Sequence, residues 1–339
     1  MDRFFKDKTI LVTGGCGSIG SKIVKNILNY KPRVVRVLDN NESAVYELEN
    51  DISNNQHVRF LVGDVRDEER VSMAMEDADI VFHAAALKHV PLCEFNPFEA
   101  VKTNVLGTEN VIKAAYSHNV EKVILISTDK VVNPISTMGA TKLLAEKIMS
   151  AANYYKGHKK TVMATVRFGN VLSSSGSVIP LFEKQISKKG PVTVTHPDML
   201  RFIMSTDRTV ELVFKAVELM KGGEIFILKM PVIKIKDIAK VMIDNMASKY
   251  GYAPKDIQTN VIGLRPGEKM YEDIMTESEA ASCYETQDMF IVQPQIMVDV
   301  DRFHNLSEYP GAKKASYKSY SSKDFEPLKE DAIKRIIFG

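Results

Sequence analysis

Residues Thr9–Gly20 read TILVTGGCGSIG, and this stretch decides the fold. Its beginning, Thr9–Thr13, is the short apolar run of a buried strand. Glycines follow it, and the chain then takes up an amphipathic pattern typical of a helix. This order favours a dinucleotide site, because Gly14, Gly17 and Gly20 allow a tight turn and a close approach of the backbone to a pyrophosphate. The alternative is a glycine turn in an unrelated α/β protein.

Further apolar runs alternate with helical patterns as far as about residue 167. Such alternation predicts a parallel sheet with right-handed crossovers, the doubly wound α/β arrangement of a Rossmann-type fold. We expect an NAD(P)-binding Rossmann domain at 1–168. Residues 169–339 are expected to form mainly a smaller substrate-binding lobe, interwoven with the first domain. Strands are predicted at 34–38, 58–62, 80–82, 122–126, 161–167 and 225–228, helices at 98–118, 209–220 and 237–249, and turns at 169–180, 195–202 and 263–269, the last leading into a short helix.

The predicted second strand ends in Asp39, where an acid can bind the ribose hydroxyls of the adenosine. Asp39 would repel a 2′-phosphate, and its neighbours Asn40 and Asn41 supply no cation to offset this repulsion. The sequence therefore favours NAD over NADP. The alternative is that Asp39 only ends the strand as a turn or cap residue.

Other residues near the predicted strand ends complete a candidate cofactor site. Asp64 is a candidate acceptor for the adenine amino group, although Asp64 or Asp67 could instead cap the following helix. Small residues at Ala84 and Ala85 would let their loop pass close to a cofactor. The predicted cofactor-binding residues are Gly14, Gly17, Ser18, Ile19, Gly20, Asp39, Asp64, Val65, Ala84, Ala85 and Lys142.

Residues 127–142 read STDKVVNPISTMGATK and follow the predicted strand 122–126. A polar loop at the carboxyl end of a buried parallel strand is where doubly wound folds place their chemistry. This loop holds a hydroxyl (Thr128), an acid (Asp129) and an amine (Lys130). Met138 and Lys142 are four residues apart, so both project from one face of the following helix. The alternative for Asp129 and Lys130 is an exposed ion pair.

Composition excludes several classes of protein. The chain has 339 residues, of which 45% are hydrophobic and 26% charged, as in a folded globular protein. A net charge of +2 without a dense basic block argues against a nucleic-acid partner. The 3 cysteines have no metal-ligand spacing, so we predict no metal site and a reducing compartment. No apolar run approaches the ~20 residues of a membrane helix, and we expect a cytoplasmic protein without a signal peptide.

Five segments together carry a resemblance to a known family. They are HAAALKHVPLCEFNPFEAVKTN (83–104), STDKVVNPISTMGATK (127–142), RFGNVLSSSGSVIP (167–180), MLRFIM (199–204) and GLRPGEK (263–269). The chain resembles the extended short-chain dehydrogenase/reductases, and among them the UDP-N-acetylglucosamine 4,6-dehydratases of nonulosonate and capsular sugar pathways, from about residue 7 to residue 280. That family usually carries Tyr-x-x-x-Lys, where this chain has Met138 and Lys142. Some members also carry Met there.

The resemblance implies a redox-neutral reaction on UDP-N-acetylglucosamine. The C4 hydroxyl is oxidised by tightly bound NAD(P)+, water is lost across C5 and C6, and the hydride returns to C6. Lys130 resembles the base that takes the C5 proton, which requires a neutral amine with a lowered pKa. Asp129 resembles the acid that protonates the C6 hydroxyl, Thr128 would bind at C4, and Lys142 would orient the nicotinamide ribose. Because a thioether carries no proton, Asp129, Lys130 or a water must accept the C4 hydroxyl proton in place of Met138.

The resemblance also suggests which residues bind the substrate. Lys88, Asn170, Arg201 and Arg265 are the candidates for holding the UDP and the sugar, since arginine offers diphosphate a planar fork of donors. The alternatives are a solvated Lys88 and an Arg265 that caps a helix or pairs with Glu268. We favour retention over inversion at C5 and expect a homo-oligomer.

Two other functions stay open at this point. One is a dehydratase or 4-epimerase of another nucleotide sugar, although Met138 counts against an epimerase. The other is a catalytically silent dinucleotide-binding sensor or scaffold, against which the presence of Asp129, Lys130 and Lys142 counts.

Overall fold

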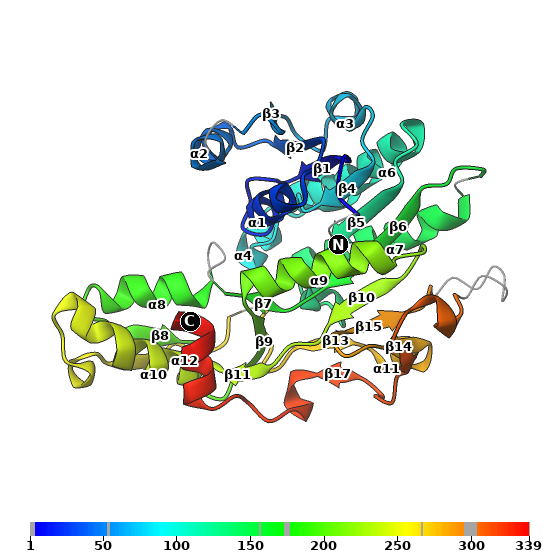
Figure 1. The fold of residues 1–339 in the computed structure, drawn as a ribbon. Helices are drawn as coiled ribbons and strands as arrows, with labels where there is room; N and C mark the ends of the chain where they lie inside the picture. The colour runs from blue at the N-terminus through cyan, green and yellow to red at the C-terminus, as the bar shows by residue number, and fades with distance from the viewer. Residues whose placement is uncertain are drawn as a thin grey trace.

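The computed structural model describes residues 4–52, 55–155, 157–172, 177–265, 267–294 and 304–338. Figure 1 shows a large sheet with helices packed on both of its faces, and a lobe of later segments beside one edge. The predicted Rossmann-type α/β fold is confirmed. Residues 173–176 of the predicted turn 169–180, and residue 266 of the predicted turn 263–269, lie outside the described residues.

A ten-stranded sheet forms the centre, with the strand order β16-β14-β15-β10-β6-β5-β4-β1-β2-β3. Strands β1 to β6 and β10 run parallel, and β14, β15 and β16 form an antiparallel edge. The order reverses at β1, which lies between β2 and β4, and a doubly wound sheet opens a crevice at such a point. The strands are β1 (Thr9–Thr13), β2 (Val34–Asp39), β3 (Val58–Val62), β4 (Ile80–His83), β5 (Lys122–Ile126), β6 (Val162–Arg167), β10 (Ile225–Leu228), β14 (Cys283–Glu285), β15 (Met289–Val292) and β16 (Lys313–Lys314).

Both faces of the parallel strands are buried, which explains their continuous apolar runs. In β1, Ile10 and Val12 pack into one core with α1 and α9, while Leu11 packs into a second core with α3, α6 and α7. Successive side chains of a strand point to opposite faces, so one short run supplies both cores. The flanking helices are α1 (Gly20–Ile27), α2 (Glu42–Ile52), α3 (Glu68–Met75), α6 (Gly107–Ser117), α7 (Thr137–Tyr155) and α9 (Thr206–Leu219).

The helix predicted at 98–118 is divided in the structure. A first helix, α5 (Pro97–Val101), continues into one wide π turn, η2 (Lys102–Leu106), and then into α6. Helix α4 (Val90–Phe95) precedes it. A π turn is a local widening that is often found at functional sites, and this one contains Asn104.

A second lobe has its own hydrophobic core. Figure 1 shows its helices beside one another, with the C-terminal helix next to α10. A three-stranded sheet, β11-β9-β7, adjoins this lobe. The lobe and this sheet contain α8 (Val178–Ile186), β8 (Val192–Val194), α10 (Ile235–Met246), β12 (Thr259–Val261), α12 (Glu330–Phe338), β7 (Asn170–Val171), β9 (Leu200–Met204) and β11 (Val232–Lys234).

Three expectations about this half need correction. The predicted turn 195–202 contains the start of strand β9, because Leu200 and Phe202 pair with β11. The turn 263–269 does not lead into a helix but into strand β13 (Asp273–Met275), which pairs with β17 (Tyr320–Ser321). Within 169–180, the described residues form β7 and the start of α8 rather than a turn throughout.

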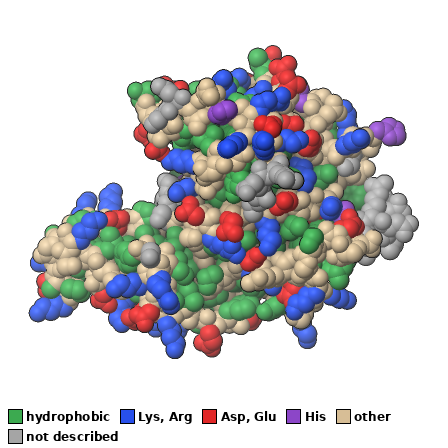
Figure 2. Space-filling view, in the orientation of Figure 1, with side chains coloured by type: hydrophobic (Ala, Val, Ile, Leu, Met, Phe, Trp, Pro, Cys, Tyr) green, Lys and Arg blue, Asp and Glu red, His purple; other side chains and the backbone are tan. Residues whose placement is uncertain are grey.

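The surface charges and the helices of the described residues bear on what the composition predicts. On the face shown in Figure 2, Lys and Arg side chains are interspersed with Asp and Glu side chains over the described residues. None of the helices in the described ranges combines the length and the apolarity that crossing a bilayer requires.

Candidate active site

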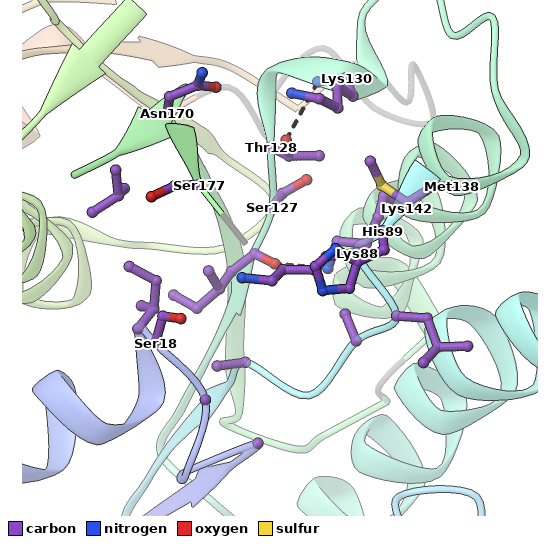
Figure 3. A pocket seen from close by; sticks show the side chains of 18 of the residues that line it. Ser18, Lys88, His89, Ser127, Thr128, Lys130, Met138, Lys142, Asn170 and Ser177 are labelled. Carbon is purple, nitrogen blue, oxygen red and sulfur yellow. Dashed lines mark hydrogen bonds between the residues drawn. The ribbon is translucent and has the colours of Figure 1, made fainter. Parts of the chain in front are cut away.

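A cleft of about 1630 Å³ runs along the carboxyl edge of the parallel strands. Its walls come from the loops that follow β1 to β6 and from the second lobe. Figure 3 shows Ser18 on one side of this cavity, Met138 and Lys142 on another, and Thr128 and Lys130 at its end. All residues predicted for the site line this cleft, namely Gly14, Gly17, Ser18, Ile19, Gly20, Asp39, Asp64, Val65, Ala84, Ala85, Lys88, Thr128, Asp129, Lys130, Met138, Lys142, Asn170, Arg201 and Arg265.

The glycine turn leaves no space for side chains. Gly14 has a φ of +63°, and a Cβ placed on it would lie 2.5 Å from the backbone nitrogen of Ala85. A Cβ on Gly20 would lie 2.1 Å from the carbonyl oxygen of Gly14. The first turn of α1 has no side-chain cap. The N–H groups of Ser21 and Ile23 donate to the carbonyl oxygens of Gly17 and Ile19, so an anion would be bound by the remaining N–H groups at this end of the helix. This geometry fits the pyrophosphate of a dinucleotide.

Two acids stand where the adenosine half of a dinucleotide would bind. Asp39 accepts hydrogen bonds from the backbone nitrogens of Cys16 and Asn41, both at 3.0 Å. Asp64 accepts from Arg66 at 2.6 Å. Burial raises the pKa of Asp64, but the hydrogen bonds from Arg66 outweigh it and hold the pKa below its ordinary value.

Arg66 is a cation in this part of the cleft that the sequence reasoning overlooked. Its guanidinium contacts Asp64 and, also at 2.6 Å, Glu99. Arg66 is thus already paired with two carboxylates. The D-V-R spacing after β3 was the available signal for Arg66, since it places the arginine two residues after Asp64.

Lys142 and Met138 share one face of α7, as predicted. The Lys142 ammonium donates to the carbonyl oxygen of Ile126 at 2.7 Å, and burial lowers its pKa to about 8. Met138 is 3% exposed and packs against Cys93 and Ala100. Lys142 is therefore a buried amine held against the end of β5, and its pKa of about 8 is close to neutral pH.

Buried polar residues behind the cleft hold its loops. In the π turn, Asn104 accepts from the Leu87 nitrogen at 2.8 Å and donates to the Leu87 oxygen at 3.1 Å. His83 lies between the hydroxyls of Thr13 (2.7 Å) and Thr108 (3.0 Å). Burial lowers the pKa of His83 to about 3, so this histidine is a neutral structural residue.

The loop after β5 brings the predicted acid and amine together. The Lys130 ammonium lies 3.1 Å and 3.0 Å from the two carboxylate oxygens of Asp129. The Thr128 hydroxyl donates to Asp129 Oδ1 at 2.7 Å. The Asp129 side chain is only 1% exposed, whereas 37% of the Lys130 side chain is exposed. Asp129 and Lys130 are thus not an exposed ion pair, because the acid is buried and only the lysine side chain is partly open to the cleft.

The ligand-free protein does not show the lowered pKa that the expected base role of Lys130 requires. Burial lowers the pKa of Lys130, but the charges of Asp129 and Glu272 outweigh burial and raise it to about 12. Burial raises the pKa of Asp129, but the neighbouring Lys130 charge outweighs it and lowers the pKa below its ordinary value. The structure therefore pairs a charged ammonium with a carboxylate.

Glu272 is the second residue that the sequence reasoning overlooked. Its Oε1 lies 3.4 Å from the Lys130 ammonium and 3.2 Å from Arg201 Nε. Its backbone is held by Ser322, whose hydroxyl accepts from the Glu272 nitrogen at 2.9 Å. Glu272 follows the GLRPGEK segment by three residues, but no spacing in the sequence connects it with Asp129.

The predicted substrate residues differ in their availability. Arg201 contacts Glu272, and its guanidinium also donates to the carbonyl oxygens of Leu200 at 2.7 Å and Lys269 at 2.9 Å. Its donors are therefore used largely within the protein. Arg265 is exposed, and Glu268 accepts from its backbone nitrogen at 3.2 Å. The contact between Glu268 and Arg265 thus involves the backbone of the turn.

The far side of the cleft offers unfilled hydrogen-bonding groups. Ser177 stands at the N-terminal end of α8 without capping it, and Asn170 comes from β7. Figure 3 shows both on the same side of the cavity. The hydroxyls of Ser127 and Ser177 are buried and have no hydrogen-bond partner among the described residues. A bound polar ligand would satisfy them. Within the same residues, no cluster of His, Cys, Asp and Glu is placed to hold a metal.

Comparisons with known proteins agree with this geometry. The family model described as polysaccharide biosynthesis protein matches residues 10–294. A Methanocaldococcus jannaschii protein, described as an uncharacterized membrane protein, is 55% identical over 99% of this chain and 97% of its own. A Campylobacter jejuni UDP-N-acetylglucosamine 4,6-dehydratase (inverting) is 41% identical over 96% of this chain and 95% of its own. The X-ray structure of Pen from Bacillus thuringiensis superposes with a TM-score of 0.89, at 44% identity and 98% coverage of both chains.

Enzymes of another reaction also match. A Rickettsia bellii protein named UDP-glucose 4-epimerase is 39% identical over 99% of this chain and 96% of its own. The comparisons therefore include both dehydratases and epimerases of nucleotide sugars.

Proposed function

The chain belongs to the polysaccharide biosynthesis protein family of nucleotide-sugar dehydratases and epimerases, and from this premise we propose that it is a UDP-N-acetylglucosamine 4,6-dehydratase. One observation carries the choice. Asp129 and Lys130 lie together in the cleft at the end of β5, 3.0 Å apart, beside Lys142 on α7. An epimerase needs to move only one hydride and one proton, whereas an elimination needs an acid and a base at neighbouring carbons.

A nicotinamide dinucleotide fits the glycine turn. The backbone at Gly14 and Gly20 excludes any Cβ, the first turn of α1 has no side-chain cap, and Asp39, which lines the same cleft, would bind the ribose hydroxyls. When bound, the nicotinamide dinucleotide would take a hydride from C4 of the sugar and later supply one to C6. NAD is favoured over NADP because Asp39 would repel a 2′-phosphate and the nearby Arg66 is already paired with Asp64 and Glu99.

The chain's own residues divide the proton chemistry. Thr128 would position the C4 hydroxyl, and Ser127 has a free buried hydroxyl next to it. Asp129 would protonate the C6 hydroxyl as it leaves. Lys130 would take the C5 proton, which a charged ammonium cannot do, so Lys130 must first give up its own proton.

Met138 leaves the C4 hydroxyl without the usual phenol. Its thioether carries no proton, and the site keeps Lys142, whose pKa burial lowers to about 8. Lys142 donates to the Ile126 carbonyl oxygen, and in this proposal it would orient the ribose. The group that accepts the C4 proton is then Asp129, Lys130 or a water in the cleft.

The UDP group would lie against the second lobe. Asn170, Ser177 and the uncapped first turn of α8 present donors on one side of the cleft, and helix N-termini favour phosphate. Arg265 and Lys88 line the same cleft and supply positive charge. Arg201 would act mainly by supporting Glu272, because its donors are used within the protein.

A 4-epimerase is the second candidate, favoured by the Rickettsia relative. The two reactions are separated by mass: a dehydratase product is one water lighter than UDP-N-acetylglucosamine, whereas an epimer has the same mass. We expect loss of water without net accumulation of reduced cofactor at the nicotinamide absorbance. A product of unchanged mass would establish the epimerase, and cofactor binding without product would indicate the silent sensor or scaffold.

A further inference from the structure

Two acidic side chains from distant parts of the chain meet at the end of the cleft. Asp129 follows β5 and Glu272 precedes β13, and the Lys130 ammonium lies 3.0 Å from Asp129 Oδ2 and 3.4 Å from Glu272 Oε1. Their side chains are 1% and 6% exposed. Two buried carboxylates that share one amine repel each other when both are ionised, and this repulsion favours one proton on the pair.

One oxygen of this cluster lacks a partner. Both oxygens of Asp129 accept from Lys130, and Glu272 Oε1 is contacted by Lys130 and Arg201. Glu272 Oε2 is buried and has no hydrogen-bond partner within the described ranges. A proton shared between Glu272 and Asp129 removes this deficit, because it gives the carboxyl a hydrogen to donate to its neighbour.

Among the described residues, the charged groups that act on Glu272 come from two elements. Asp129 and Lys130 face Glu272 from the loop after β5, and Arg201 faces it from β9. Ser322 contacts only the Glu272 backbone. Two cations thus oppose two acids, and a proton moved from Lys130 to the acids leaves the net charge of the cluster unchanged.

The pKa of Glu272 lies near neutral pH. Burial, followed by the negative charge of Asp129, raises the pKa of Glu272 to about 7 against the opposing charges of Lys130 and Arg201. A single aspartate beside Lys130 would be a much weaker proton acceptor. Glu272 therefore gives the acids a proton affinity that Asp129 alone does not have.

Resting on the dehydratase function proposed above, we propose that Asp129 and Glu272 act as a pair that takes the proton of Lys130, so that one transfer makes both the base and the acid of the elimination. Glu272 is a positioning residue in this scheme. It acts through Asp129, which faces the leaving group.

The protons and electrons balance over one turnover. Lys130 passes a proton to the pair and becomes a free amine. The amine takes the C5 proton, the electrons of the C5–H bond form the C5=C6 double bond, and the C6–O bond breaks as Asp129 protonates the departing oxygen, which leaves as water. Lys130 later returns a proton to C5 as the hydride that left C4 is added to C6, which saturates the C5=C6 bond. The proton released by the C4 hydroxyl replaces the Lys130 proton that left in the water.

The pH dependence has a defined sign. Below the pKa of the pair, the acids already hold a proton in the resting protein and cannot take that of Lys130. Activity therefore rises as the pH increases through about 7, the value at Glu272. In Glu272→Gln the repulsion is gone, so Asp129 titrates at lower pH. We expect the rising acid limb of the pH–rate profile to move by more than one pH unit to lower pH. We also expect kcat on the plateau above that limb to fall about a hundred-fold.

The test combines infrared spectroscopy with kinetics. In the ligand-free wild-type protein, we expect a carboxylic C=O band that disappears on titration with a midpoint near pH 7. Glu272→Gln should lack it, and the exposed neighbour variant Glu277→Gln should keep it. Glu272→Asp retains two acids and should restore the acid limb of the pH–rate profile and at least part of kcat. This result distinguishes a proton-sharing acid pair from a purely structural role of Glu272.

The outcomes are distinct. A band in the ligand-free protein without turnover of UDP-N-acetylglucosamine would refute the proposed function and leave the pair standing. A wild-type spectrum without the band would overturn the pair even if the protein is active. A Glu272→Gln variant with a lower plateau but an unmoved pH limb would also overturn it.

Discussion

At the scale of single residues, Lys130 is charged because two acids contact it from different parts of the chain. The sequence shows Asp129 beside it but not Glu272, which is brought there by β13 and held by Ser322. Reasoning along the sequence could therefore identify the acid and the amine but not their resting protonation. The same limit applies to Arg66, whose pairing with Glu99 depends on the fold.

Replacing Asp129 by Asn removes the acid and leaves its shape. We expect kcat to fall by a factor of about 10² to 10⁴, the usual contribution of a general acid, while the protein still folds and binds cofactor. Steady-state rates and far-ultraviolet circular dichroism check this. The exposed Asp331 on α12 gives the control variant Asp331→Asn, and equal rates in both variants would contradict the role of Asp129.

Lys142 predicts a pH-dependent stability. Its pKa is lowered from 10.5 to about 8, so between these values the unfolded chain binds more protons and stability rises with pH. The buried charge costs about 3 kcal/mol at pH 7, partly offset by the hydrogen bond to Ile126. Lys142→Met should therefore be at least as stable as wild type at pH 7, with an advantage that shrinks towards pH 10.

Urea unfolding at both pH values measures this difference. A stability difference between Lys142→Met and wild type that is the same at pH 7 and pH 10 would show that Lys142 is not a desolvated amine. Activity of the variant should be lost in either case, because Met has no donor for the ribose that Lys142 is proposed to bind.

At the scale of elements, strands were predicted more reliably than helices. Each buried parallel strand is a short apolar run with a clear end, and β1, β3, β5 and β10 occur at their predicted bounds. The division at η2 could not be foreseen, because a π turn changes no apolar spacing strongly enough to be read. Strand β13 replaced a predicted helix, because its partner β17 lies far along the chain.

The π turn makes Asn104 a test of how the cleft is held. Asn104→Ala removes three hydrogen bonds, two partly buried ones with the Leu87 nitrogen and oxygen and a buried one with Thr141. We expect the free energy of unfolding to fall by about 1–3 kcal/mol and the Michaelis constant to rise, because the loop that carries Lys88 loses its support. Lys102→Ala, on the exposed side of the same turn, is the control. Equal stability of the two variants would contradict this account.

At the scale of the whole molecule, a buried ion cluster ties the sheet to later segments of the chain. Arg167 at the end of β6 contacts Glu146 of α7 and Glu279 of α11 (Glu277–Ala281), both at 2.7 Å. Its side chain is 1% exposed. Arg167→Ala would leave two buried carboxylates unpaired and should lower the free energy of unfolding by about 3–5 kcal/mol.

A surface arginine provides the matched comparison. Arg208 pairs with Glu211 and Asp288, each at 2.7 Å, but is 42% exposed. Arg208→Ala should cost less than about 1 kcal/mol. Chemical denaturation of both variants measures the contrast, and similar losses would show that the buried cluster does not join the parts of the molecule as described.

The central claim is that this cleft dehydrates UDP-N-acetylglucosamine, and proton NMR in D2O tests it most directly. The purified protein is incubated with the sugar nucleotide and no added cofactor. The account predicts a 4-keto-6-deoxy product that carries deuterium at C5, formed by wild type but not by Lys130→Ala. In a parallel reaction in H2O, where the product has a proton at C5, the nuclear Overhauser contact between the C3 and C5 protons then decides between the predicted retention and the inversion named for the Campylobacter relative. An unchanged sugar in protein that contains bound dinucleotide, or a product that keeps its C5 hydrogen, would contradict the claim.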